Sequence, residues 1–422
     1  MKKAVFKLSS ISIALVTLLV LQGCIKDTIT TTYTYTMHIP VYKTKAQVRE
    51  NIKSNNTRSL EKTGKLYLYG SYIFLNEIDK GIHVIDNSNP AAPVNKAFID
   101  IPGNRDIAVK GNILYADMYT DLVAIDISNP NSVQVKKVIE NTFPHRYYDG
   151  WFAADTSKVI VEWIKRDTTV TEAIHMGSWG RKDAMFLQAG GNTGNSAGGG
   201  AAPTGMGGSM ARFAIVDKTL YTVGTAELKV FNISTATDPS FVVKKHIGMN
   251  IETIFPFQNK LFIGSATGMY IYDISNASNP IQQSQFNHVR SCDPVIADQK
   301  YAYVTLRSGT QCLGFTNQLE VIDITNLNSP QLVKIYSMTN PHGLSKDGST
   351  LFICDGRDGL KIYNASNVNN LQLIHKISGI ETYDVITVNG VAMVVAKDGL
   401  YQYDYSQLNN IRLLSKITIT KP

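Results

Sequence analysis

The chain has 422 residues, 44% of them hydrophobic, and includes 21 tyrosines and 15 phenylalanines. Its formal net charge is +7, but the lysines at positions 2, 3 and 7 lie in an N-terminal segment that we expect to be removed. The remaining 38 basic and 34 acidic residues leave about +4, which is too small an excess to argue for nucleic-acid binding.

The first 24 residues have the pattern of a secretory signal followed by a lipid-attachment cysteine. A basic start precedes an apolar run from Ile11 to Leu21, and the sequence LQGC then ends at Cys24. Gln22 departs from the small residue that is commoner there. A single transmembrane anchor is the alternative, but the run is short for a spanning helix. The sequence therefore predicts a signal peptide over residues 1–23 and a lipoprotein anchored by at least two acyl chains on Cys24.

Residues 24–60 separate this cysteine from the repeats, and we expect a lipidated tether there. Residues 28–36 read TITTTYTYT, and this alternation favours an extra strand over a flexible segment. Residues 46–52, AQVRENI, are expected to form one short helix.

A strand followed by a tight turn recurs from residue 81 to the C-terminus. The first copy reads GIHVIDNSNP, in which the alternating strand ends at Asp86 and Ser-Asn-Pro supplies turn residues. Further copies are DLVAIDISNP from Asp121, ELKVFNIST from Glu227, GMYIYDISNASNP from Gly268, QLEVIDITNLNSP from Gln318, GLKIYNASN from Gly359 and GLYQYDYSQ from Gly399. A spacing of about 40 residues, with several short strands in each unit, is typical of a β-propeller.

The number of units is less clear than their nature, because the third unit is irregular. First strands are expected near Lys65, Asp106, Asp149, Arg212, Thr253, Asp293, Gly343 and Asp384. No copy of the turn motif follows Asp149, and a glycine-rich stretch over residues 190–208 lies before the next unit. We predict an all-β fold with a single propeller over residues 61–422, made of eight repeat units with the third degenerate. Seven blades with a larger excursion between the second and third are the alternative.

The glycine-rich stretch is expected to belong to an inserted loop near residues 175–210. It reads GGNTGNSAGGGAAPTGMGG and has neither a GK[ST] ending nor a helical run after it, which argues against a phosphate-binding loop. Its small residues cannot bury enough surface to offset the entropy of ordering, so we predict a mobile surface loop.

The repeats resemble those of the bacterial LVIVD-repeat family, in which GLxIIDISNPxxP units build propellers, often on lipoproteins. The resemblance covers roughly residues 64–420 and implies a fold and a compartment, without a settled activity. Ile25-Lys26-Asp27, directly after the lipid-attachment cysteine, looks like an export signal of surface lipoproteins in Bacteroidetes-type bacteria. The expected location is thus the outer membrane, on its periplasmic or outer side.

Three cysteines besides Cys24 would reach an oxidising compartment. Cys292 and Cys312 are expected at the same end of one unit, so we predict a disulfide between them, although three free thiols are the alternative. Cys354, within LFICD, is interpreted as a small buried side chain.

Motif searches favour binding over catalysis. The eight histidines form no HxH or HxxxH pair, and no CxxC motif is present. We therefore assign no catalytic residue and no resident cofactor. In a propeller, however, the starts of the first strands converge at one mouth of the channel, where mixed charges could hold a ligand or a divalent cation. The candidates are Arg105, Asp106, Asp149, Glu252, Arg290, Asp293, His342 and Asp384.

The alternative for these charged residues is that they only pair with backbone groups between blades. We hypothesise a binding or scaffold module at the outer membrane or cell surface, with a protein or glycan partner and no nucleic acid. A hydrolase or lyase using an acidic channel mouth is one alternative. A helper in outer-membrane assembly is another, because some assembly lipoproteins are eight-bladed propellers.

Overall fold

The computed structural model describes residues 28–143, 157–175, 196–197, 206–289, 294–309 and 314–420. The chain forms two compact units, one from Met1–Val41 and Glu162–Gln188, the other from Tyr42–Val161 and Ala189–Pro422. The predicted signal peptide and Cys24 lie outside the described residues. No helix within the described ranges has the length and apolar character needed to cross a membrane.

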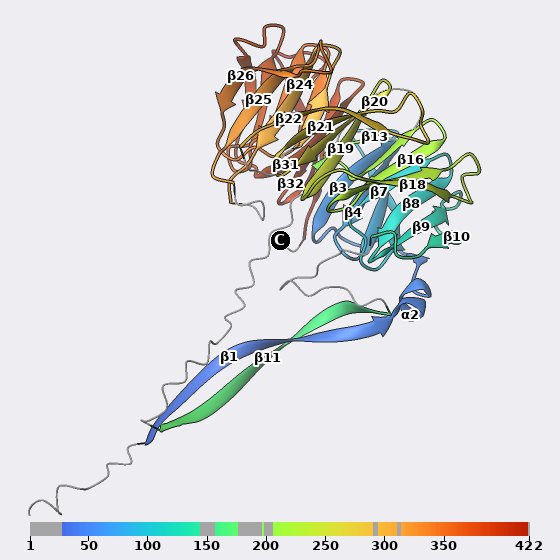
Figure 1. Ribbon diagram of the computed structural model, residues 1–422, viewed down its shortest axis with the longest axis vertical. Helices are drawn as coiled ribbons and strands as arrows, with labels where there is room; N and C mark the ends of the chain where they lie inside the picture. The colour runs from blue at the N-terminus through green and yellow to red at the C-terminus, as the bar shows by residue number, and fades with distance from the viewer. Residues whose placement is uncertain are drawn as a thin grey trace, which may run out of the picture. The chain divides into compact units, whose positions relative to one another are not determined.

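The larger unit is a β-propeller in which the described residues form seven blades, each a four-stranded antiparallel meander (Figure 1). The first three blades contain β3 (Thr63–Tyr69), β4 (Tyr72–Glu77), β5 (Gly81–Asp86) and β6 (Val94–Asp100); β7 (Ile107–Lys110), β8 (Ile113–Met118), β9 (Asp121–Asp126) and β10 (Gln134–Ile139); and β15 (Phe213–Val216), β16 (Thr219–Val223), β17 (Glu227–Asn232) and β18 (Ser240–His246).

Blades 4 to 7 have the same order of strands. They contain β19 (Ile251–Phe257), β20 (Lys260–Ser265), β21 (Gly268–Asp273) and β22 (Ile281–Asn287); β23 (Val295–Ala297), β24 (Tyr301–Leu306), β25 (Gln318–Asp323) and β26 (Gln331–Ser337); β27 (Leu344–Asp347), β28 (Thr350–Cys354), β29 (Leu360–Asn364) and β30 (Gln372–Ile377); and β31 (Thr382–Val388), β32 (Val391–Ala396), β33 (Gly399–Asp404) and β34 (Arg412–Thr418).

The predicted count of eight units is therefore wrong, and the alternative of seven blades fits. Part of the segment interpreted as a degenerate third unit forms β11 (Lys158–His175), which pairs with β1 (Thr28–Thr44) in a separate two-stranded sheet. Asp149, the expected start of that unit, lies outside the described residues. The predicted extra strand after residue 28 is present as β1. Hydroxyl pairs link the two strands, with Thr32 and Thr171 Oγ1 atoms 3.0 Å apart and Thr34 and Thr169 Oγ1 atoms 2.9 Å apart.

The recurring Asp or Asn has a structural role at the end of each third strand. Its side-chain Oδ1 accepts a hydrogen bond from the amide two residues later, as between Asp86 and Ser88 at 3.0 Å and between Asp273 and Ser275 at 2.7 Å. The same contact recurs at Asp126, Asn232, Asp323, Asn364 and Asp404. This local bond turns the chain away from the ladder, which explains why the motif allows either Asp or Asn.

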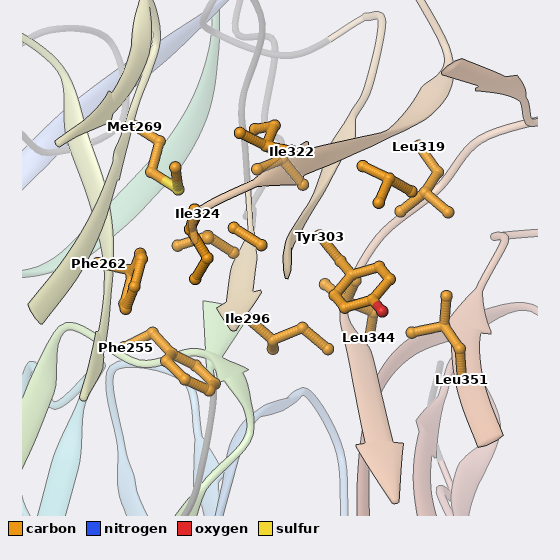
Figure 2. Packing of buried hydrophobic residues seen from close by; sticks show 14 of the residues in the cluster. Phe255, Phe262, Met269, Ile296, Tyr303, Leu319, Ile322, Ile324, Leu344 and Leu351 are labelled. Carbon is orange, nitrogen blue, oxygen red and sulfur yellow. The ribbon is translucent and has the colours of Figure 1, made fainter. Parts of the chain in front are cut away.

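The hydrophobic core lies between blades. Figure 2 shows Ile296 and Tyr303 of blade 5 among Phe262 of blade 4 and Leu344 and Leu351 of blade 6. Middle strands such as β8 and β20 are buried along their whole length because both of their faces are covered. Continuous apolar strands of this kind are expected for sheets packed on both sides.

The ring closes where blade 7 meets blade 1. Leu60 and Ile419 form a parallel bridge, and the amide of Thr420 donates to the carbonyl of Leu60 over 3.1 Å. The side chains of Asn87 and Gln402 exchange two hydrogen bonds of 3.0 and 2.6 Å across the same junction. All four strands of blade 7 come from the C-terminal end of the chain, so closure depends on packing between complete blades.

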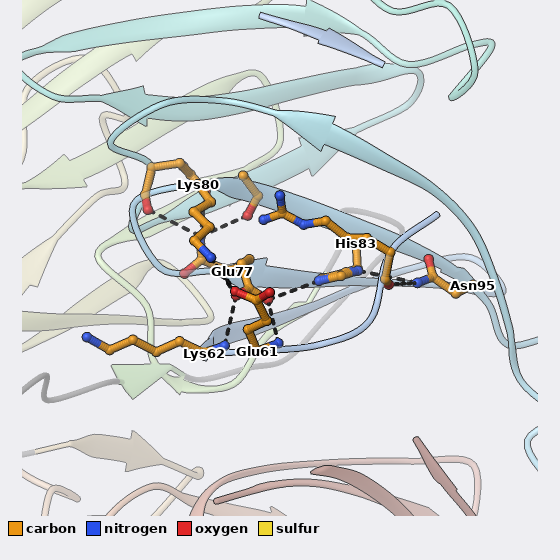
Figure 3. A network of polar contacts seen from close by, with 10 residues as sticks. Glu61, Lys62, Glu77, Lys80, His83 and Asn95 are labelled. Atoms are coloured by element: carbon orange, nitrogen blue, oxygen red, sulfur yellow. Dashed lines mark hydrogen bonds and ion pairs between the residues drawn. The ribbon is translucent and has the colours of Figure 1, made fainter. Parts of the chain in front are cut away.

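A buried carboxylate in blade 1 holds the segment that leads into this closure (Figure 3). Glu77 accepts hydrogen bonds from the amides of Lys62 at 2.8 Å and Glu61 at 3.1 Å, and it lies 3.1 Å from Nε2 of His83. Burial alone would raise the pKa of Glu77, but the hydrogen bonds from His83 and these two amides lower it to about 2. Glu77 and His83 are thus a structural pair that orders the chain beside Leu60.

Before blade 1, the chain forms α2 (Lys45–Arg49), shorter than the helix predicted over residues 46–52. Thr44 and Gln47 form a capping box, and two basic side chains fix the helix to blade 2. Arg49 lies 2.7 Å and Lys45 lies 3.3 Å from the buried carboxylate of Asp121. The short strand β2 (Lys53–Asn55) then extends blade 1 at its outer edge by pairing with β6.

Candidate functional site

The inner strands bring ionisable side chains of successive blades to one end of the ring. Each of these residues lies within two residues of the start of an inner strand or directly after the adjacent second strand, which is the same end of the sheet. They are Lys65 in blade 1, Asp106 in blade 2, Arg212 in blade 3, Glu252 in blade 4, Arg307 in blade 5, His342 in blade 6 and Asp384 in blade 7.

Asp106 links three blades. Its buried carboxylate forms an ion pair with the ammonium group of Lys65, and its Oδ2 accepts from the amide of Arg212 over 2.8 Å. Burial lowers the pKa of Lys65, while the negative charge of Asp106 acts in the opposite direction. Asp106 therefore holds blades together, and its carboxylate does not face an open channel mouth. Arg105, its neighbour, points to Asp79 and makes two hydrogen bonds of 2.9 and 3.0 Å.

Arg307, His342 and Tyr383 form a cluster across blades 5, 6 and 7. The Nη1 of Arg307 contacts His342, with 2.9 Å to Nε2, and Oδ1 of Asn340 lies 2.8 Å from the same nitrogen. The rings of His342 and Tyr383 lie 5.3 Å apart. Burial lowers the pKa of His342 well below its usual value and Arg307 lowers it further, so this imidazole is neutral at pH 7. Burial raises the pKa of Tyr383 to about 12.

Glu252 connects this cluster with blade 3. Burial lowers the pKa of both Arg212 and Arg307, and the carboxylate of Glu252 opposes that effect on both guanidinium groups. The Nε of Arg212 is buried and makes no hydrogen bond. We define the side chains of Arg212, Glu252, Arg307, His342 and Tyr383 as the mouth cluster. Within it, the carboxylate of Glu252 acts on both guanidinium groups, and Asp106 and Asp117 also oppose the effect of burial on Arg212.

Asp384 lies among buried residues of blade 7 and is itself fully buried. Its Oδ1 accepts from the amide of Val385 over 3.0 Å, whereas its Oδ2 makes no hydrogen bond. Burial raises the pKa of this carboxyl to about 7, although the Val385 hydrogen bond and the charge of Lys65 lower it. A carboxyl in this setting carries its proton in mildly acidic solution.

The last part of the predicted surface loop lies inside the ring. We define residues 206–211 as the channel segment, which contains β13 (Met206–Gly207) and β14 (Ser209–Met210). Met206 pairs with Leu68 and Gly207 with Tyr67 of β3, the innermost strand of blade 1. On other blades, the amide of Leu344 donates to Oγ of Ser209 over 2.7 Å, and the amide of Ile254 donates to the carbonyl of Ala211 over 2.8 Å.

These contacts reach blades 1, 4 and 6, so the channel segment crosses the centre of the ring. Ser209 and Met210 are each 2% exposed. Gly208, the last residue of the stretch predicted to be a mobile surface loop, is also buried, which corrects that prediction at its end. Glycine and serine make the position possible, because their small side chains allow the backbone to approach the inner strands. A further short strand, β12 (Ser196–Ala197), pairs with β14.

The remaining predicted site residues are only partly covered by the described ranges. Asp149, Arg290, Asp293 and the predicted disulfide partners Cys292 and Cys312 lie outside them. Cys354 is a free, buried thiol, as expected. Among the described residues, no group of three His, Cys, Asp or Glu side chains could hold a metal ion.

Sequence reasoning did not select Arg212, Arg307 or Tyr383 as site residues. Arg307 follows the second strand of its blade, whereas the sequence pattern points to residues at the starts of first strands. Arg212 was predicted as the start of a first strand, and it lies one residue before β15. This position is the signal by which it could have been selected as a site residue.

Comparison with known proteins identifies LVIVD repeats in the chain. The LVIVD repeat family matches residues 62–100, 103–139, 259–288 and 291–338, which fall on blades 1, 2, 4 and 5. The chain is therefore a β-propeller with LVIVD repeats. No match was found among curated proteins.

Several solved structures share the fold. The chain is similar to a protein from Lactobacillus plantarum, with 12% identity, coverage of 85% of this chain and 97% of that chain, and a TM-score of 0.53. It is also similar to the periplasmic gluconolactonase PpgL of Pseudomonas aeruginosa, with 11% identity, 85% and 97% coverage and a TM-score of 0.52. BamB from Moraxella catarrhalis has 7% identity, 89% and 97% coverage and a TM-score of 0.50. At these identities the likeness concerns the fold alone.

The burial of Asp384 leads to a prediction about stability and pH. Its folded-state pKa of about 7 lies above the ordinary value of 3.8, so the folded protein holds this proton between roughly pH 4 and pH 7. The free energy of unfolding should therefore fall as the pH rises through that interval. Asp384→Asn removes the ionisation, and above pH 7 it should be more stable than the wild type by up to about 4 kcal/mol.

Urea unfolding of both proteins at pH 4.5 and pH 8.5 measures this difference. Asp106→Asn is the control, because loss of the ion pair with Lys65 should destabilise the protein without a comparable gain at high pH. An effect of Asp384→Asn that is the same at both pH values would contradict the assignment.

Proposed function

We propose that this propeller with LVIVD repeats is a lipid-anchored binding module, exported to the outer membrane and displayed on its periplasmic or outer side. The sequence supports the anchor through the apolar run before LQGC and the cysteine at position 24. Two or more acyl chains on this residue would give stable attachment, which one chain does not. The propeller would then be held close to the membrane by the N-terminal stretch.

We propose further that the mouth cluster binds an acidic group of a protein or glycan ligand. The single observation that carries this proposal is Arg212, whose Nε is buried beside Glu252 without a hydrogen-bond partner. A guanidinium group has several donors in one plane and suits a carboxylate or phosphate. The contact between Arg307 and His342 supports a preorganised site, because it limits the freedom of both side chains, and the charge of Glu252 acts on Arg307.

Binding is favoured over the other functions considered. A hydrolase or lyase with an acidic channel mouth would depend on carboxylates such as Asp106 and Asp384, and both are buried. A helper in outer-membrane assembly rests on likeness of fold, which propellers with unrelated functions share.

The anchor predicts the behaviour of a Cys24→Ala variant. Without the thiol there is no atom to which the diacylglyceryl group can be attached, so the variant should remain an unlipidated precursor. Metabolic labelling with a palmitate analogue and membrane fractionation measure this outcome. A processed Cys24→Ala protein that still fractionates with membranes would contradict the lipoprotein proposal.

The mouth cluster predicts which substitution weakens binding. An array of acidic and neutral glycans and peptides, probed with residues 25–422, should select acidic probes, and Arg212→Gln should reduce their affinity at least tenfold. Arg412→Gln is the matched control. Arg412 lies on β34, the outer strand of blade 7, and pairs with Asp404 over 2.8 Å between Nη2 and Oδ2. Equal affinities of the wild type and Arg212→Gln for every acidic probe would place the binding surface elsewhere.

A further inference from the structure

The inner edge of blade 1 accepts a strand from within the channel. β3 pairs with β4 on one side, so its other edge faces the centre of the ring. The channel segment uses this edge only opposite Leu68 and Tyr67, although β3 runs from Thr63 to Tyr69. The edge of a strand offers backbone donors and acceptors to any extended chain that reaches it.

The channel segment is held mainly by its backbone, and its glycines leave no space for larger side chains. A Cβ atom at Gly208 would lie 2.7 Å from Oδ2 of Asp384 and 2.9 Å from Cγ1 of Ile386. A Cβ atom at Gly207 would lie 3.3 Å from Cβ of Ala211 and 3.4 Å from Cδ2 of Tyr67. Position 208, beside Asp384, therefore has room only for glycine, whereas position 207, beside Tyr67, has slightly more room for a Cβ atom.

The same segment leaves one polar group unsatisfied. Oδ2 of Asp384 is buried next to Gly208 and accepts no hydrogen bond. An unpaired polar atom in the interior costs free energy, so an occupant with a hydrogen-bonding group at this point would bind better than the present one. Glycine also loses more backbone entropy than other residues when it is ordered, which weakens the hold of the segment.

We propose that the channel is a binding site for an extended peptide with small residues and a polar group that forms a hydrogen bond with Asp384, and that residues 206–211 occupy this site in cis. The ligand adds a strand to the inner edge of β3 and displaces Met206 and Gly207 from it. This site adjoins the mouth cluster, because residue 211 precedes Arg212 and Tyr383 precedes Asp384, but the proposal does not depend on an acidic ligand binding to that cluster.

The experiment opens the channel by substitution and supplies the strand in trans. Gly208→Val should expel the channel segment, because the new side chain would overlap Asp384 and Ile386. The matched control is Gly224→Val, since a Cβ at Gly224 would meet only the carbonyl oxygen of Glu227, at 3.9 Å. The probe is a fluorescein-labelled peptide with the sequence of residues 203–211, PTGMGGSMA, and the control peptide is PTGMVVSMA.

Fluorescence polarisation with the full-length protein should show at least tenfold tighter binding of PTGMGGSMA to Gly208→Val than to the wild type. The reason is that the wild-type segment competes at the high effective concentration of a tethered chain. Gly224→Val should behave as the wild type, and PTGMVVSMA should bind to none of the proteins.

A folded Gly208→Val variant that binds PTGMGGSMA no better than the wild type would overturn the proposal. If Gly208→Val does not fold, Gly208→Ala takes its place, because its methyl group still meets Asp384. Failure of both variants to fold would also overturn it, since the segment would then be an indispensable part of the core.

Discussion

Each blade of this propeller depends on the cover that its two neighbours provide. Strands such as β8 and β20 are buried on both faces, so a blade on its own would expose two apolar surfaces to water. The ring must therefore close, and the contacts between blades 7 and 1 meet that requirement through Leu60, Ile419 and the Asn87–Gln402 pair. The buried Glu77, which binds the amides of Glu61 and Lys62, fixes the chain at this junction.

Closure also determines where charge accumulates. Inner strands start at one side of the ring, and charged residues at these starts become neighbours although they are far apart in the sequence. Some of them are used for assembly, as in the Lys65–Asp106 ion pair that bridges the first two blades. Arg212 differs because its buried Nε has no hydrogen-bond partner. In our proposal, the mouth cluster combines contacts that stabilise the ring with a site for an acidic group of a ligand.

Much of the fold could be predicted from the sequence because the repeat is local. The Asp or Asn at the end of each third strand makes its own turn, and the first strand of blade 2, expected near Asp106, begins at Ile107. The predicted number of blades was wrong because alternating residues identify a strand but not the strand with which it pairs. Residues 158–175 do form a strand, but it pairs with β1 and not within a blade. Composition likewise misjudged the end of the glycine-rich stretch, because Gly208 is buried where its lack of a side chain lets the backbone approach Asp384 and Ile386. No sequence pattern identifies Arg307 as a site residue, since its neighbours Glu252, His342 and Tyr383 come from other blades.

Occupancy of the channel by the protein's own backbone can be measured directly by hydrogen–deuterium exchange on the full-length protein. The amide of Arg212 donates to the buried carboxylate of Asp106, and Met206 and Gly207 pair with β3. We predict that amides of residues 206–212 exchange as slowly as those of the inner strands β3 and β31. Exchange of these amides at the rate of an unstructured chain would contradict a filled channel.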